Sequence, residues 1–200
     1  MQIVCLDLEG VLTPEVWLAV ADRTGLRELR LTTRDIADYD VLMKKRISIL
    51  SDHGVGLPQI QEVIATVDPL DGALDFLDYL RHRTQVVILS DTFRQFAVPL
   101  MKKLGWPTLF CNELEIDPDN MITGYKLRQA EGKRMAVRAF KSLGFRVIAS
   151  GDSYNDLGML EEADHGILFR PPESIVSSHS NFPAFSEYAD FCGFLESILE

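Results

Sequence analysis

The sequence predicts an α/β protein with a doubly wound, Rossmann-like parallel sheet and a small helical cap inserted after the first strand. Three apolar runs end in acidic or hydroxyl residues, which is typical of strands buried in a parallel sheet: QIVCLDL (2–8), QVVILSD (85–91) and RVIASGDS (146–153). Helical patterns alternate with these runs after residue 71, whereas residues 15–70 contain no convincing strand. We therefore expect a core domain formed by residues 1–14 and 71–200, and a helical cap domain at 15–70.

The expected cap contains three helical patterns. EVWLAVADRTG (15–25) has apolar residues at helical spacing and ends at Gly25, and DYDVLMKKRISILSDHG (38–54) ends at Gly54. The third pattern, LPQIQEVIATV (57–67), carries a proline in its first turn, where the missing backbone N–H has no cost. These patterns predict a compact insert of short helices.

The remainder of the core alternates in the same way. Amphipathic helices are predicted at 71–83, 93–105, 132–144 and 155–164, with a last helix near 190–199. A short apolar strand, HGILF, follows at 165–169. TLFCNELEID and MITGYKL flank the turn sequence DPDN (117–120), which predicts a hairpin.

Charge and cysteine content exclude several classes of protein. The chain has 200 residues and a formal net charge of −10, so no basic face is evident for nucleic acid. Its apolar runs are far shorter than the ~18 residues of a membrane span. Three widely separated cysteines form no metal-binding pattern, which favours reduced thiols in the cytoplasm: Cys5, Cys111 and Cys192. We expect a cytoplasmic protein.

Polar residues follow three of the predicted strands, where an open α/β sheet binds its ligands. They are mostly acids: Asp7 and Glu9; Ser90 and Asp91; Asp152, Ser153, Asn155 and Asp156. If the strands are neighbours, these acids converge at one edge of the sheet, which is costly unless a cation neutralises them. Oxygen ligands without nearby histidine or thiolate favour Mg²⁺ over zinc or copper.

Carboxylates with Mg²⁺ suggest phosphate chemistry. Ser90 and adjacent backbone N–H groups could bind phosphate oxygens, and Lys133 at a helix start could supply positive charge. No GxxxxGK[ST] or GxGxxG motif is present, which disfavours a nucleotide site. Asp7 is the best candidate nucleophile, forming an aspartyl-phosphate. Glu9 could protonate the leaving alkoxide and later activate water.

Four motifs resemble the haloacid dehalogenase superfamily in order and spacing: DLEGVLTPE, ILSD, GK and GDSYND. The helical insert is similar to the cap of phosphoserine phosphatases. The first motif, DLEG, resembles that of a bacterial branch which also transfers the phosphoryl group to homoserine. The resemblance implies a Mg²⁺-dependent phosphoserine phosphatase, with homoserine as a possible second substrate.

The family pattern implies a role for each matching residue. Asp7 matches the nucleophile and a metal ligand, Glu9 the acid/base position and a ligand through its backbone carbonyl. Asp152 matches the direct carboxylate ligand and Asp156 its outer partner. Four residues match substrate-binding positions: Ser90, Asp91, Lys133 and Asn155. Glu9 is a departure, because most family phosphatases have aspartate there, and its longer arm changes the proton-transfer geometry.

The cap should recognise the amino-acid part of the substrate. Glu15 could pair with an ammonium group and Arg46 with a carboxylate through its planar fork, as the resemblance also implies. Glu15 could instead be an ordinary acid of a first helical turn. The KKR run could mark a solvated face, in which case Lys44 or Lys45 would serve.

The sequence is also compatible with different roles for some of these residues. Ser90 could be a helix cap, and Arg134 is a rival to Lys133. The substrate could be another small phosphomonoester, or the protein could be a non-catalytic aspartyl-phosphate switch. The insert after the first strand disfavours a switch of the receiver type.

Overall fold

The core of the molecule is one sheet, described here from a computed structural model that covers residues 1–32, 35–36 and 38–199. Within these residues the sheet has the strand order β4-β3-β2-β1-β5-β6-β7. Neighbouring strands are parallel except for the antiparallel pair β3 and β4. The strands are β1 (Gln2–Leu6), β2 (Gln85–Phe93), β3 (Thr108–Ile116), β4 (Ile122–Lys126), β5 (Arg146–Gly151), β6 (His165–Phe169) and β7 (Ala184–Phe185). The parallel sheet and the β3–β4 hairpin predicted from sequence are thus present.

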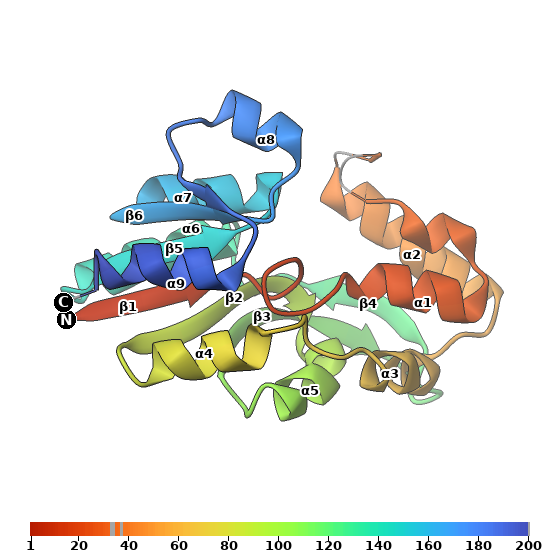
Figure 1. Ribbon diagram of the computed structural model, residues 1–200. Helices are drawn as coiled ribbons and strands as arrows, with labels where there is room; N and C mark the ends of the chain where they lie inside the picture. The colour runs from red at the N-terminus through yellow and green to blue at the C-terminus, as the bar shows by residue number, and fades with distance from the viewer. Residues whose placement is uncertain (33–34, 37, 200) are drawn as a thin grey trace.

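Helices connect the strands and cover both faces of the sheet (Figure 1). They are α1 (Val16–Thr24), α2 (Tyr39–Asp52), α3 (Leu57–Ala65), α4 (Ala73–Arg81), α5 (Arg94–Lys103), α6 (Gly132–Ser142), α7 (Leu157–Glu162), α8 (Glu173–Ser178) and α9 (Tyr188–Glu196), with 3₁₀ turns η1 (Arg27–Arg30) and η2 (Tyr154–Asp156). Each helix predicted from sequence is present within a few residues of its expected limits. No helix of the described residues is long and apolar enough to cross a membrane.

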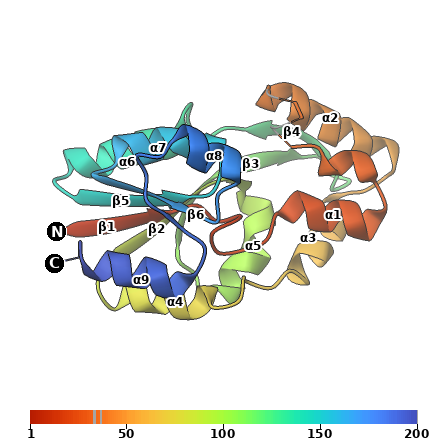
Figure 2. The same cartoon turned by 45° about the horizontal axis from the view of Figure 1, so that its top comes forward.

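Alternate side chains of β1 enter two separate hydrophobic clusters. Val4 and Leu6 belong to the cluster that includes residues of α4, α5 and α9. Ile3 and Cys5 belong to the cluster formed with α6 and α7. Figure 2 shows these two sets of helices on opposite sides of the sheet. Burial on both faces explains why the central strands are continuous apolar runs rather than alternating ones.

Helices α1, α2 and α3 lie together beyond the carboxyl ends of β1 and β2 (Figures 1 and 2). Gly25 ends α1 in the left-handed conformation, with φ of 75°. The Asp38 side chain begins α2 by accepting hydrogen bonds from the backbone N–H groups of Asp40 and Val41. Apolar residues of these helices share the larger hydrophobic cluster with the sheet, so the insert packs directly on the core.

The end of β2 differs from the predicted strand. The strand continues to Phe93 rather than ending at Asp91, and its pairing with β3 shifts register between Leu89 and Phe93. Ser90 and Asp91 therefore lie where the regular ladder is interrupted. Such irregularities redirect side chains beside functional sites, and here they precede the start of α5.

Candidate active site

Three neighbouring strands bring the predicted acids to one edge of the sheet. Asp7 follows directly after β1, and its backbone N–H donates to the Ser150 carbonyl of β5 (2.9 Å). Asp7, Asp152 and Asp156 each offer a carboxylate oxygen, and these atoms lie within 4.8 Å of one another. The expected convergence follows from the order β2-β1-β5, because parallel neighbours end at the same edge.

Asp156 is fully buried and already hydrogen-bonded through both oxygens. Its Oδ2 accepts from the backbone N–H groups of Asp152 and Ser153, each at 3.0 Å. Its Oδ1 accepts from the Lys133 ammonium at 2.7 Å. Asp156 therefore holds the strand-end loop and the lysine in place.

Lys133 is the central cation of the site. Its Nζ lies 2.7 Å from Asp156, 3.0 Å from Asp7 and 3.5 Å from Asp91, and the residue is only 5% exposed. Burial by itself would lower the pKa of Lys133, but Asp156, Asp7 and Asp91 raise it well above its usual range. Lys133 is therefore charged at neutral pH. Its rival Arg134 instead pairs with Glu131 and Glu162.

One lysine does not neutralise the acidic set. Burial, and then Asp156, raise the pKa of Asp7 well above its usual range, although Lys133 opposes this. Burial, then Asp156 and Glu15, raise the pKa of Asp152 to about 7. The raised pKa values mean that the ionised forms of Asp7 and Asp152 are unfavourable without a further cation. A hard divalent cation bound to their oxygens would favour the ionised form of both carboxyls.

Two glycines allow the carboxylates to approach the backbone this closely. A Cβ atom on Gly10 would lie 2.4 Å from Cγ of Asp152, and one on Gly151 would lie 2.3 Å from Cγ of Asp156. Gly10 also has φ of +78°, which L side chains rarely adopt. The glycines in the first and last motifs therefore make room for the acid that faces them.

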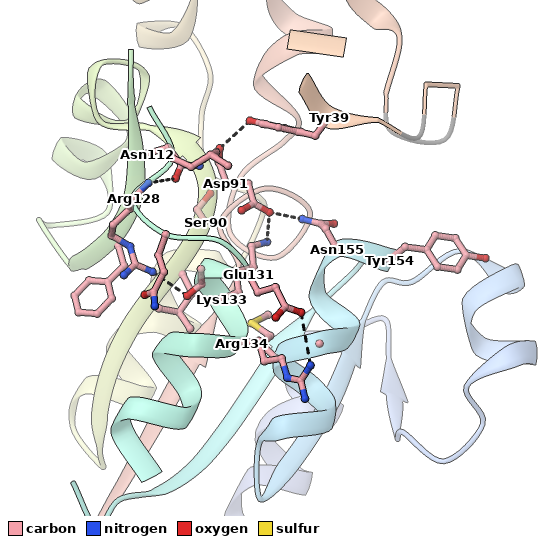
Figure 3. A pocket seen from close by; sticks show the side chains of 17 residues that line it. Tyr39, Ser90, Asp91, Asn112, Arg128, Glu131, Lys133, Arg134, Tyr154 and Asn155 are labelled. Atoms are coloured by element: carbon pink, nitrogen blue, oxygen red, sulfur yellow. Dashed lines mark hydrogen bonds and ion pairs between the residues drawn. The ribbon is translucent and has the colours of Figure 1, made fainter. Parts of the chain in front are cut away.

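Ser90, Asp91 and Asn155 lie on the open side of Lys133 (Figure 3). The Asp91 carboxylate accepts from the Asn155 amide at 2.8 Å and faces Lys133 at 3.5 Å. The Ser90 hydroxyl oxygen accepts from the backbone N–H of Thr92 at 3.1 Å, which leaves its own O–H free to donate. The four residues expected to bind substrate here are thus brought together.

Glu9 and Glu15 face each other between the core and α1. Glu9 Oε2 accepts from the backbone N–H of Val16 at 3.3 Å. Burial raises the pKa of Glu9 well above its usual range, and the neighbouring Glu15 carboxyl adds to this by repulsion and a hydrogen bond. A carboxyl whose pKa is raised holds its proton more tightly, which suits general acid catalysis.

Arg46 is buried rather than part of a solvated face, in contrast to the two lysines that precede it. It is 6% exposed, whereas Lys44 and Lys45 are exposed. Its guanidinium stacks 4.4 Å from the ring centre of Trp17 and donates to the Leu31 carbonyl at 2.7 Å. The Arg46 Nε is buried and has no hydrogen-bond partner among the residues that the structure describes. Burial lowers the pKa of Arg46 to about 10, so it is protonated at neutral pH.

Two residues of the site have no signal in the sequence. The Tyr39 hydroxyl, at the start of α2, donates to the Asp91 carbonyl at 3.4 Å, and the Asn112 amide of β3 donates to the same carbonyl at 3.2 Å. They hold the irregular end of β2 from the cap side and the sheet side. Neither belongs to a motif, and both act through tertiary contacts.

The chain matches one known family of hydrolases. The family model of the haloacid dehalogenase-like hydrolases matches residues 1–164, so the chain belongs to this family of hydrolases. This confirms the family predicted from the four motifs and favours an enzyme over a non-catalytic switch. Members of the family generally use a divalent metal ion, and the described residues include an acidic group, Asp7, Asp152 and Asp156, that could hold one.

Two relatives specify the branch of that family. The chain is 60% identical over 190 residues to phosphoserine phosphatase ThrH of Pseudomonas aeruginosa, covering 95% of this chain and 93% of that enzyme. It is 57% identical over 184 residues to a phosphoserine phosphatase of Pseudomonas syringae pv. tomato, covering 92% of this chain and 78% of that enzyme. The protein is therefore an enzyme of the phosphoserine phosphatase group.

Solved structures agree with the predicted fold class. A phospho-aspartyl intermediate analogue of phosphoserine phosphatase aligns with a TM-score of 0.80 at 18% identity, covering 96% of this chain and 98% of that one. A substrate-bound phosphoserine phosphatase complex aligns with a TM-score of 0.74 at 18% identity, covering 94% and 93%. At these identities the likeness confirms the α/β fold with its inserted helices.

Proposed function

We propose that the protein is a Mg²⁺-dependent L-phosphoserine phosphatase that works through a phosphorylated Asp7. The observation that carries this proposal is the placement of Asp7 against Lys133 and beside Asp152 and Asp156 at the end of β1. The names of the two Pseudomonas relatives support the substrate. We propose the division into a core, 1–14 and 71–200, and a cap, 15–70, with the substrate bound between them.

The metal would be held by carboxylate and carbonyl oxygens. We assign Asp7, Asp152 and the backbone carbonyl of Glu9 as direct ligands. Asp156 would act in the outer shell, because its oxygens already accept from Lys133 and two backbone N–H groups. Mg²⁺ is the preferred ion because every ligand is a hard oxygen. When bound, it would neutralise the carboxylates and the negative charge of the phosphate.

In the first half-reaction, an Asp7 carboxylate oxygen attacks phosphorus and the bond to the seryl oxygen breaks. Four residues hold the phosphate oxygens: Ser90, Asp91 through its backbone N–H, Lys133 and Asn155. Glu9 donates its proton to the leaving seryl oxygen, which its raised pKa permits. Serine then leaves and the phosphoryl group remains on Asp7.

In the second half-reaction, Glu9 accepts a proton from water, and the water oxygen attacks the phosphorus of phosphorylated Asp7. The bond to Asp7 breaks and inorganic phosphate is released. The hydroxyl of homoserine can take the place of water at the same position, in which case the product is phosphohomoserine. Hydrolysis and transfer then share one covalent intermediate.

Glu15 and Arg46 would recognise the amino-acid part of the substrate. The Glu15 carboxylate pairs with the ammonium group, and the Arg46 guanidinium, with its unpartnered Nε, binds the carboxylate. Stacking on Trp17 and the hydrogen bond to Leu31 fix the guanidinium in advance, which lowers the entropy cost of binding.

Phosphate release from L-phosphoserine tests this proposal. We expect turnover with Mg²⁺, loss of turnover in EDTA, and recovery when Mg²⁺ is added back. Asp7→Asn should abolish both turnover and acid-stable labelling of the protein by radiolabelled substrate, whereas the exposed Asp75→Asn should leave both unchanged. Activity that survives Asp7→Asn would exclude the covalent mechanism. A panel of small phosphomonoesters would show whether phosphoserine is preferred.

Homoserine transfer needs a separate experiment. Homoserine added to the phosphoserine reaction should produce phosphohomoserine and reduce phosphate release without slowing serine release. Phosphate release that is unaffected by homoserine would restrict the enzyme to hydrolysis.

We also propose a cytoplasmic location. The support is that all three cysteines of the chain are free thiols, as reduced surroundings maintain them.

A further inference from the structure

The Lys133 ammonium faces as many carboxylates as it has N–H groups to donate. A lysine has three N–H groups, and the Lys133 Nζ lies 2.7 Å from Asp156, 3.0 Å from Asp7 and 3.5 Å from Asp91. A phosphate oxygen that accepts a hydrogen bond from Lys133 must therefore take the place of one of these carboxylates.

Asp91 is the carboxylate that can give way. Its contact with Lys133 is the longest of the three, and its side chain is 44% exposed, against 6% for Asp7 and 0% for Asp156. Asp156 also accepts from two backbone N–H groups, and Asp7 is the nucleophile of the proposed mechanism. Asp91 lines a cavity of about 910 Å³, so its side chain has room to turn away from Lys133.

The same oxygen of Asp91 also engages Asn155. The Asn155 amide donates to Asp91 Oδ2 at 2.8 Å, and Oδ2 is the atom that faces Lys133 (Figure 3). The Ser153 hydroxyl donates to the side-chain oxygen of Asn155, which directs the Asn155 amide group towards Asp91. One carboxylate oxygen thus contacts two of the groups that hold phosphate in the proposed mechanism.

The backbone of Asp91 is held in place from two sides. Its carbonyl accepts from the Tyr39 hydroxyl at 3.4 Å and from the Asn112 amide at 3.2 Å. The carboxylate can therefore leave Lys133 and Asn155 by rotation of the side chain alone. The backbone N–H of Asp91 keeps its place for the phosphate.

We propose that the Asp91 carboxylate occupies the phosphate subsite of the unliganded enzyme and competes with phosphate for Lys133 and Asn155. This inference rests on the proposed function, which places phosphate at these two residues. A phosphate group binds only to molecules in which Asp91 has turned away. Its apparent affinity is therefore lowered by the fraction of molecules in that state.

The competition affects product more than substrate in its consequence. Phosphoserine also contacts Glu15 and Arg46 in the proposed mechanism, and binding energy from parts of a substrate remote from the reacting bond can offset such a displacement. Inorganic phosphate has no such part, so it should bind weakly and leave readily. Asp91 is then a specificity-determining residue that disfavours free phosphate.

Calorimetric titration of inorganic phosphate into the Mg²⁺-loaded enzyme tests this role. Asp91→Ala should lower the dissociation constant for phosphate by about five- to tenfold, because a half-exposed, charge-assisted contact no longer competes. The matched control is Glu131→Gln, at an exposed acid that lines the same cavity but pairs with Arg134. This control should change the constant by less than about twofold.

An Asn155→Ala background separates displacement from repulsion between charges. If Asp91 must leave Asn155, the gain from Asp91→Ala should be at least about twofold smaller in this background, where that contact is already absent. A gain of the same size in both backgrounds would indicate repulsion through space and would overturn the proposal. Thermal melting without phosphate checks that each variant is folded.

The outcomes also separate this proposal from the proposed function, because calorimetry requires no turnover. If Asp91→Ala binds phosphate more tightly but the wild type does not hydrolyse phosphoserine, the substrate assignment fails and the role of Asp91 is supported. If the wild type hydrolyses phosphoserine and Asp91→Ala binds phosphate no more tightly than the wild type, the role of Asp91 is excluded and the proposed function stands.

Discussion

Removing the Lys133 ammonium should destabilise the protein strongly in the absence of metal. Lys133 is the buried cation within 3.5 Å of three carboxylates, those of Asp156, Asp7 and Asp91. Lys133→Met retains most of the side-chain volume and removes only the charge and its hydrogen bonds. The buried carboxylates are then left without their cation. Removing only one partner of a buried ion pair is strongly destabilising, because the remaining charge is buried without compensation.

The magnitude follows from that burial. Breaking a buried pair by removing one partner costs about 3–5 kcal/mol, and Lys133 and Asp156 are 5% and 0% exposed as side chains. We expect this loss in the free energy of unfolding at pH 8 in EDTA. Because burial and nearby acids already raise the pKa of Asp7, its carboxyl protonates readily as the pH falls. A carboxyl whose pKa is raised in the folded state stabilises the fold at low pH, and this stabilisation is lost as the pH rises. The stability difference between wild type and Lys133→Met should therefore be smaller at pH 5 than at pH 8.

Urea unfolding of wild type and Lys133→Met at pH 5 and pH 8 measures this, with EDTA and with Mg²⁺. Added Mg²⁺ should recover part of the stability, since it supplies the missing positive charge. Lys102→Met, at an exposed position of α5, is the matched control and should stay within about 0.5 kcal/mol of wild type. A loss below about 1 kcal/mol for Lys133→Met at pH 8 in EDTA would refute the view that Lys133 neutralises this cluster.

Two further predictions concern substrate and metal affinity. Arg46→Lys should raise KM for phosphoserine by about tenfold, because an ammonium cannot make the paired contacts of the guanidinium fork. The exposed Lys45→Ala should leave KM unchanged. If steady-state kinetics show the same KM change for both variants, Arg46 does not recognise the substrate carboxylate. Mg²⁺ should bind about tenfold more weakly at pH 6 than at pH 8, because the pKa of Asp152 is raised to about 7 and protons compete for its oxygens. If calorimetry gives the same Mg²⁺ affinity at both pH values, Asp152 is not a ligand.

The positions of the acids could be predicted because they depend on local pattern and topology alone. An apolar run that ends in an acid identifies both a strand and the end at which its side chains gather. Asp7 and Asp152 follow this rule, and the neighbouring positions of β1 and β5 bring them together. Lys133 could be predicted for a similar reason, since it begins α6 at the same edge.

Contacts between core and cap could not be predicted in this way. The hydroxyl of Tyr39 meets the carbonyl of Asp91 across 52 positions of sequence, and the stacking of Arg46 on Trp17 joins two different helices. Both depend on how α1 and α2 pack on the sheet, which periodicity does not encode. The KKR run therefore left a choice among three basic residues, and only burial distinguishes Arg46 from its neighbours.

The glutamate at position 9 has a physical reason that the sequence did not disclose. Its carboxyl accepts a hydrogen bond from the backbone N–H of Val16 at 3.3 Å, at the first residue of α1. The residue before it, Glu15, makes no side-chain cap for that helix. Glu9 thus joins the proposed proton-transfer position to the first helix of the cap.

Glu9→Asp tests this connection. Withdrawing the carboxyl by one methylene should remove the bond to Val16, at a cost of about 1 kcal/mol, as for the loss of a helix cap. It should also weaken the contact with Glu15, which after burial is the largest cause of the raised pKa at position 9 and exceeds the opposing effect of the bond from Val16. The general acid would then lose its proton at lower pH, so the alkaline fall of kcat/KM should move to lower pH. Unchanged urea unfolding together with an unchanged pH profile would show that the longer side chain has neither role, because a shortened carboxyl cannot keep both contacts.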